Sequence, residues 1–194
     1  MREVEPVVLE GPTLRLEPLT VAHAKPLFRH AWPEVFQWFL DFPRDASYVA
    51  FEAFIDRTLL QPNSVNFTMV LNATGEPVGM TSFLEIRVQH HGLEIGRTWI
   101  APTHQGTRVN PESKYLLLSH AFEELGALRV QLKTDSNNVH SQRAIEKLGA
   151  RREGVLRNYQ VRSNGRMRDT VIYSVIDKEW PDLKNALAAR LAAL

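Results

Sequence analysis

Residues 104–150 decide the fold, and they read HQGTRVNPESKYLLLSHAFEELGALRVQLKTDSNNVHSQRAIEKLGA. A polar loop that holds Gly106 and Arg108 runs into Asn110-Pro111. This pair is typical of a helix start, because Asn can cap an unpaired amide and Pro has no N–H to leave unpaired. A helix, a strand, an Asn-rich turn and a second helix are expected to follow. That order predicts an anion site at the loop and, one strand later, a place for an extended ligand.

Periodicity along the rest of the chain predicts a mixed α/β fold. The expected strands are residues 13–18, 66–71, 78–88, 93–101, 128–134, 151–156 and 167–176. The expected helices are residues 21–30, 48–60, 111–125, 141–148 and 177–194. The strands between 66 and 101 should form an antiparallel meander. Only the strands on either side of helix 111–125 should be parallel neighbours, because a crossover joins them. Helices are expected on both faces of the sheet.

Composition excludes several classes of protein. The 194 residues predict one domain, 1–194, with a core of about 12–177 and a terminal helix at 178–194. A net charge of +1 argues against nucleic-acid binding. The chain has no cysteine, which excludes a thiolate zinc site and a Cys nucleophile, and no metal-ligand spacing is present. No signal-like run or membrane-length apolar segment is present, so we expect a cytoplasmic protein with no membrane partner.

Two polar segments are candidates for ligand binding, and each has a structural alternative. Loop amides 106–109 and the following helix start can converge on a phosphate, with Arg108 and Lys114 adding charge. The alternative is a capped helix with solvated basic residues. Asn138 offers a donor and an acceptor to a ligand that carries its own amides, with Ser141 in the next turn. The alternative there is a turn followed by an N-cap.

Together these residues resemble the GNAT superfamily of acyl-CoA-dependent N-acetyltransferases over roughly residues 12–177. The most specific element is N-x-x-S-x-x-x-x-E-K-L-G, present as NVHSQRAIEKLGA at 138–150. EIGRTWIAP at 94–102 and TLRLEPL at 13–19 add support. The branch it resembles most is the RimJ/RimL-like group, which acetylates protein N-terminal amines and related small amines. The resemblance implies a mixed, mostly antiparallel central sheet with a V-shaped splay between two parallel strands.

The resemblance also implies a path for acetyl-CoA. Amides 106–110, with Arg108 nearby, would hold the pyrophosphate, the strand edge at 99–101 would pair with the pantetheine arm, and Asn138 would hydrogen-bond that arm. The implied donor-binding residues are Trp99, Ile100, Ala101, Gln105, Gly106, Thr107, Arg108, Val109, Asn110, Lys114, Asn138, Ser141 and Arg143.

Two positions depart from the family pattern. The loop is usually [RQ]-x-x-G-x-[GA], whereas QGTRVN places Arg108 and Asn110 where small residues are expected. Arg108 could therefore clamp a phosphate or swing out. Many members also carry a Tyr as general acid where this chain has Ile145. Ser141, which the resemblance places near the thioester sulfur, is the nearest candidate for that role.

Aminolysis of a thioester needs a neutral amine, so a general base is required. The leading candidates are Glu94, which alternation places on one face with Gly96, Thr98 and Ile100, and Glu85, placed with Thr81 and Phe83. The other candidates are His90, His91 and Asp169. Expected acceptor-binding residues are Trp38, Phe39, Phe83 and Tyr159, with Arg157 and Arg168 as weaker candidates. The aromatic segment Trp32, Phe36, Trp38, Phe39 and Phe42 could instead pack the N-terminal helices.

Three hypotheses therefore compete. The leading one is transfer of an acetyl group from acetyl-CoA to a primary amine of a small molecule or peptide. The second is a noncatalytic CoA-binding or protein-interaction module on the same fold. A nucleic-acid-binding domain has little support, because the chain is nearly neutral. The Leu and Ala stripe of the terminal helix is compatible with packing on the sheet or with a homodimer.

Overall fold

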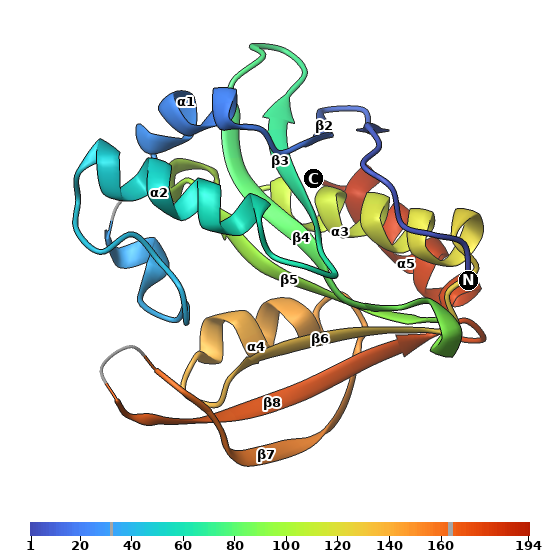
Figure 1. Cartoon of the computed structure of the whole chain (residues 1–194). Helices are drawn as coiled ribbons and strands as arrows, with labels where there is room; N and C mark the ends of the chain where they lie inside the picture. The colour runs from blue at the N-terminus through green and yellow to red at the C-terminus, as the bar shows by residue number, and fades with distance from the viewer. Residues whose placement is uncertain (32, 163–164) are drawn as a thin grey trace.

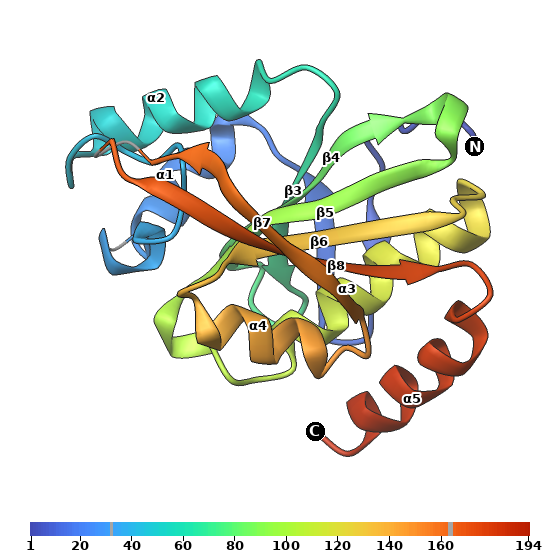
Figure 2. The ribbon, with the colours of Figure 1, turned by 90° about the horizontal axis from the view of Figure 1, so that it is seen from below.

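The computed structural model describes residues 1–31, 33–162 and 165–194. One eight-stranded sheet has the order β1-β2-β3-β4-β5-β6-β8-β7 (Figure 1). Its strands are β1 Leu9–Glu10, β2 Leu14–Pro18, β3 Val65–Leu71, β4 Pro77–Arg87, β5 Gly92–Ile100, β6 Arg129–Asp135, β7 Arg151–Val161 and β8 Met167–Ile176. The helices are α1 Ala24–Phe28, α2 Tyr48–Leu59, α3 Val109–Ser119, α4 Val139–Glu146 and α5 Trp180–Ala192. Figure 2 shows α1 and α2 on one side of the sheet and α3, α4 and α5 on the other.

The expected antiparallel meander and the single parallel pair are both confirmed. β3, β4 and β5 pair antiparallel in sequence order. β5 and β6 pair parallel only where Gly92–Glu94 face Arg129–Gln131. Beyond that register the two strands separate (Figure 1). The sheet therefore carries the V-shaped splay that the resemblance implies, next to the crossover made by α3.

Two residues with positive φ shape the strands around the splay. Arg97 in β5 has φ +49° and Glu85 in β4 has φ +46°, a conformation that costs energy for a side chain larger than Gly. The β4–β5 register shifts beside each of them. Each bulge adds one residue and turns the following side chain to the other face of the sheet. The expected sharing of faces by Glu94 with Thr98, and by Glu85 with Phe83, is therefore wrong.

The apolar core has two parts, one on each face of the sheet. The larger part lies between the sheet and α3, α4 and α5, and the smaller part lies beneath α1 and α2. In the smaller part, Phe36 packs edge-on against Phe54 at 5.6 Å and Trp99 at 5.5 Å between ring centroids. The aromatic connector between α1 and α2 is therefore largely core. Trp32 lies outside the described residues.

The terminal helix packs on this chain. Trp180 at the start of α5 stacks on Phe122 at 5.5 Å and donates a hydrogen bond to Glu123 at 2.7 Å. Leu187 and Leu191 from its apolar stripe are buried. Pro181 lies in the first turn of α5, where its missing N–H leaves no hydrogen bond unmade. The stripe thus packs beside α3 in the larger part of the core.

Candidate active site

The unpaired part of β5 is the centre of the candidate site. Within the described chain, no residue of β5 after Glu94 pairs with β6. Trp99, Ile100 and Ala101 are buried at the end of this segment. Gln105 donates its side-chain amide to the carbonyl of Ile100 at 3.1 Å. The predicted donor-binding residues Trp99, Ile100, Ala101 and Gln105 therefore lie at the end of the unpaired segment, where Gln105 is bonded to β5.

The loop before α3 presents free amides. Gly106 has φ +75°, which a residue with a side chain rarely adopts, and this conformation turns the chain toward α3. Thr107 donates its hydroxyl to the carbonyl of His104 at 2.7 Å and accepts from the amide of Val109. Among the described residues, the amides at 106, 107 and 108 have no acceptor. Three free N–H groups at a helix N-terminus are suited to an anion.

Arg108, rather than Asn110, is the N-cap of α3, which begins at Val109. The expected cap at Asn110 is wrong because the helix begins two residues before Pro111. Arg108 Nε donates to Glu112 Oε2 at 3.0 Å, so the guanidinium leans along the helix. The backbone of Arg108 therefore borders the loop, while its side chain is held by Glu112.

Glu112 connects this helix start to β2. Its buried carboxylate accepts hydrogen bonds from the amides of Thr13 at 2.8 Å and Leu14 at 3.2 Å, and from the Thr13 hydroxyl. Burial by itself raises the pKa of Glu112, but these bonds and the one from Arg108 outweigh it, so the pKa is lowered. Glu112 is therefore an ionised anchor for the loop.

Lys114 does not face the loop, contrary to the expectation from sequence. Its side chain is 4% exposed, and Nζ donates to Thr98 at 2.7 Å and Thr81 at 3.2 Å. Burial lowers the pKa of Lys114 to about 7. A lysine one turn into a helix usually reaches solvent, but here the bulge at Arg97 turns Thr98 toward α3 and creates a polar niche.

The turn after β6 forms the N-cap of α4, which is the structural alternative considered from sequence. Asn138 Oδ1 accepts from the amide of Ser141 at 3.1 Å and so caps α4. Its Nδ2 has no partner in the described part of the chain and is free for a ligand. Ser141 is half-buried beside it, and Arg143 is exposed. Ile145 packs in the core, so no acidic side chain occupies the position where many family members carry Tyr.

Glu94 is the best-placed base among the five candidates. Its carboxylate is 2% exposed and contacts Lys133 Nζ at 2.9 Å and Gln131 Nε2 at 3.2 Å. Burial raises the pKa of Glu94, against the opposing effect of Lys133. A Cβ on Gly96 would lie 2.9 Å from Glu94 Oε1, so a larger residue there would displace this carboxylate.

The other four base candidates are less suitable. Glu85 is exposed and pairs with Lys133 Nζ at 2.7 Å. His90 is exposed, and the ring of His91 contacts the amino group of Met1 at 2.8 Å. Asp169 accepts from the amide of Asn158 at 2.7 Å. Glu85 nevertheless shares one cation with Glu94, which places the two leading candidates at one site.

A groove lined by Gln131, which donates a hydrogen bond to Glu94, is the candidate acceptor site. It has a volume of about 340 Å³ and includes Tyr159, one of the predicted acceptor residues. The lining residues are Glu85, Arg87, Arg129, Gln131, Glu153, Gly154, Leu156, Tyr159 and Ile172. Phe83 does not line it, because its side chain is fully buried on the opposite face against Phe67 at 5.5 Å. The acceptor role expected for Phe83 is therefore wrong.

Trp38 and Phe39 come from the connector between α1 and α2. Phe39 packs on Phe36 at 5.5 Å, so it belongs to the smaller core. Trp38 lies 5.1 Å below the guanidinium of Arg162, which also pairs with the buried Asp135. Asp135 contacts Arg168 Nε at 3.6 Å as well. Sequence reasoning missed this link, because no local pattern joins residues 38, 135 and 162.

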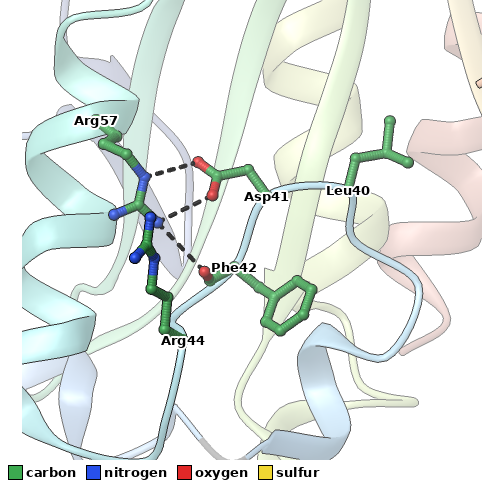
Figure 3. A pocket seen from close by; sticks show the side chains of 5 residues that line it. All are labelled: Leu40, Asp41, Phe42, Arg44 and Arg57. Atoms are coloured by element: carbon green, nitrogen blue, oxygen red, sulfur yellow. Dashed lines mark hydrogen bonds and ion pairs between the residues drawn. The ribbon is translucent and has the colours of Figure 1, made fainter. Parts of the chain in front are cut away.

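A second hollow of about 290 Å³ lies in the same connector. Figure 3 shows its lining residues, with Arg57 of α2 reaching across to Asp41 and to the carbonyl of Phe42. Arg57 Nη2 lies 2.9 Å from Asp41 Oδ1. These contacts tie the connector to α2 and thus fix the segment that follows Trp38.

The chain belongs to the GNAT acetyltransferase family. Residues 13–151 match the family described as "Acetyltransferase (GNAT) domain". No helix in the described ranges is long and apolar enough to cross a bilayer. Within the same ranges, no group of three or more His, Asp or Glu side chains is arranged to hold a metal ion.

Relatives with solved structures share the whole fold. A candidate acetyltransferase from T. thermophilus is 42% identical, with a TM-score of 0.92 over 98% of this chain and 100% of that one. A GCN5-related N-acetyltransferase from Brucella melitensis is 31% identical, with a TM-score of 0.92 over 98% of this chain and 87% of that one. YdaF of Bacillus subtilis (strain 168), described as a candidate ribosomal N-acetyltransferase, is 32% identical over 106 residues. That match spans 55% of this chain and 57% of YdaF.

Proposed function

We propose that this protein transfers an acetyl group from acetyl-CoA to a primary amine, carried by a protein N-terminus or a small molecule, by direct attack in a ternary complex. The observation that carries the proposal is the separation of β5 from β6 after Glu94, beside a loop with three free amides. Membership in the GNAT family supports the reaction type. The chain contains no cysteine, so transfer without a thioester on the enzyme is the economical route.

The residues present fit an acyl-CoA donor. The amides at 106–108 and the N-terminus of α3 suit a pyrophosphate, to which backbone N–H groups and the helix dipole are attracted. The open edge of β5 at residues 95–100 can add a strand-like ligand by backbone hydrogen bonds. Asn138 Nδ2 supplies a donor at the other wall of the splay. In this proposal these groups together hold the donor along the splay.

Glu94 would take the proton of the acceptor ammonium, because it is buried, its hydrogen-bond partner Gln131 lines the groove, and burial raises its pKa. An unpaired backbone N–H on β5 would stabilise the developing oxyanion. Ser141 would lie near the departing thiolate, as the resemblance implies. Most of the rate enhancement would come from holding two substrates in reactive orientation.

The RimJ/RimL-like branch is the best-supported subgroup. YdaF, which is 32% identical to this chain over 106 residues, is described as a candidate ribosomal N-acetyltransferase. The fold also matches Mycobacterium smegmatis RimJ solved with CoA-disulfide, with a TM-score of 0.78 and 19% identity. We therefore propose a peptide or small amine as acceptor.

Titration calorimetry with acetyl-CoA tests the proposal at Asn138. Asn138→Ala and Asn138→Ser both remove the amide donor and should weaken binding about tenfold, the loss of about one polar contact. Asn138→Ser keeps an oxygen for the α4 cap and should melt like the wild type, whereas Asn138→Ala should be less stable. His140→Ala, at an exposed position in the same helix, is the matched control. Absence of acetyl-CoA binding by the wild type would refute the proposal.

The second candidate is a noncatalytic CoA-binding module. It is favoured by Ile145 at the position where many family members carry Tyr, and by the ammonium of Lys133 against Glu94. A thiol-release assay across peptides, polyamines, amino acids and aminoglycosides separates the two. Acetyl-CoA binding without turnover of any amine would favour this second candidate.

A further inference from the structure

Lys133 is the one lysine of the described chain whose ammonium lies between two carboxylates. Its Nζ is 2.7 Å from Glu85 Oε1 and 2.9 Å from Glu94 Oε2. The ring of Tyr159 lies over it, with 5.9 Å between Nζ and the ring centroid. Carboxylates and an aromatic face are the groups that bind a cationic amine. These three groups therefore form an ammonium subsite, and the side chain of Lys133 occupies it.

The conformation of Glu85 shows that this arrangement costs energy. Glu85 has φ +46° beside a shift of the β4–β5 register. The shift turns its carboxylate away from the core face, where Phe83 lies, and toward Lys133. Backbone strain of about 1–3 kcal/mol persists only where surrounding contacts hold it, and such strain clusters at functional sites.

Lys133 also stands at the point where the sheet opens. Gln131 is the last β6 residue that pairs with β5, and Lys133 follows it by two residues on the same face. Gln131 Nε2 and Lys133 Nζ both contact Glu94 Oε2. The amine of Lys133 thus lies against the carboxylate that the proposed function uses as its base, beside the strands that would receive the thioester.

We propose that Lys133 is an internal acceptor, which the protein acetylates on Nζ when acetyl-CoA occupies the splay. This inference rests on the proposed function. Glu94 takes one proton from the Nζ ammonium, and the neutral amine attacks the thioester carbonyl carbon. A C–N bond forms, the C–S bond breaks, and the second amine proton passes to the thiolate to give free CoA. The product is Nε-acetyl-Lys133, which no longer pairs with Glu85 or Glu94.

The reaction should be slow at neutral pH and faster in base. Burial lowers the pKa of Lys133, but the two carboxylates outweigh it, and the pKa is raised. The groups that face Lys133 are Glu85 from β4, Glu94 from β5 and Tyr159 from β7, with Gln131 beside it on β6. Below that pKa, the neutral fraction of the amine rises about tenfold for each unit by which the pH increases.

Mass spectrometry after incubation with acetyl-CoA tests the inference. We expect one acetyl group per chain, mapped to Lys133, at a rate at least about tenfold above that of the exposed Lys147 because the amine is held beside the donor. Lys133→Arg keeps a cation for both carboxylates and should abolish the mark. Free CoA in excess should suppress the mark, and acetyl phosphate, which lacks the CoA portion, should not favour Lys133.

The outcomes separate this inference from the proposed function. Acetylation spread evenly over the lysines, or unchanged in Lys133→Arg, overturns it. Acetyl-CoA that binds in calorimetry and leaves Lys133 unmodified at pH 9 also overturns it, while the proposed function stands. Absence of acetyl-CoA binding would overturn both.

Discussion

Arg108 and Glu112 lie one helical turn apart on α3, with Nε of Arg108 3.0 Å from Oε2 of Glu112. The same carboxylate accepts the amides of Thr13 and Leu14 at the start of β2. One buried anion therefore fixes the first turn of α3 to the start of β2. Glu112 thus holds the start of the helix, and with it the preceding loop, in place. The loop amides at 106–108 remain free among the described residues.

Glu112→Gln should destabilise the protein by about 1–3 kcal/mol, because a neutral amide replaces a carboxylate that accepts several hydrogen bonds. The pKa of Glu112 is lowered in the fold, so its stabilisation is present above the ordinary carboxyl pKa and is lost as pH falls through the lowered value. Urea unfolding at pH 7 and pH 3 should show a smaller difference between variant and wild type at pH 3. An equal difference at both pH values would contradict this account.

Arg108→Ala should weaken acetyl-CoA binding by less than about tenfold at low salt, because the guanidinium is already engaged by Glu112 and only partly available to a phosphate. Calorimetry at two salt concentrations measures the effect. Lys147→Ala, which removes a cation elsewhere on the surface, is the control. A loss of several hundredfold would mean that Arg108 leaves Glu112 when the donor binds.

Glu94→Gln should lower kcat for amine acetylation by about 10²–10⁴-fold while leaving donor binding intact. Burial raises the pKa of Glu94, so wild-type activity should fall with decreasing pH sooner than an ordinary carboxylate would cause. Initial rates between pH 5 and 9 measure that limb, which the variant should lack. Glu85→Gln, at an exposed carboxylate, should retain the limb. If both variants lacked this limb of the pH profile, Glu85 and Glu94 would act together as the base.

Lys114→Met should stabilise the protein at low pH by roughly 1–3 kcal/mol, since it removes a buried cation that no carboxylate of the described chain neutralises. The Thr81 and Thr98 hydroxyls lie 2.9 Å apart and can pair without it. Because the folded pKa of Lys114 is lowered to about 7, wild-type stability should fall as pH drops from about 10 toward 7 and stay low beneath it. Urea unfolding at pH 6 and pH 9 should therefore show the larger gain at pH 6.

Phe36→Ala should cost about 3–5 kcal/mol, because it empties the centre of the aromatic cluster beneath α1 and α2. Thermal unfolding measures the loss. Phe36→Leu keeps most of the volume and should cost less. Val49→Ala, at an exposed position of α2, should be nearly neutral. If Phe36→Ala were neutral as well, the connector would not belong to the core.

Local pattern located most of the elements, but it missed β1 and ended the strand at 151–156 five residues before β7 ends. Three predicted elements agree with the structure to within one residue at each end. They are the strands at 66–71 (β3) and 78–88 (β4) and the helix at 48–60 (α2). The parallel contact between β5 and β6 followed from the helix that joins them, because a crossover of that length allows no hairpin. These inferences needed only period and connection length.

Features that depend on distant residues could not be read in this way. Nothing near Arg97 in the sequence indicates that it takes a positive φ, and the bulge there reverses the faces of Thr98 and Ile100. The niche of Lys114 comes from two other strands, so the default of a solvated lysine was wrong. The position of Lys133 between Glu85 and Glu94 likewise depends on three strands meeting.

The opening between β5 and β6 leaves one seam of the sheet without its ladder. In the proposed binding mode, the acyl donor lies between these two strands and pairs with the open edge of β5, much as a ninth strand would. Anything that binds only the native state adds RT ln(1 + [L]/Kd) to stability, about 2.7 kcal/mol at a hundredfold excess over Kd. The lifetime of this protein against proteolysis should therefore follow the supply of acetyl donor, so that a metabolite pool sets how much of the protein persists.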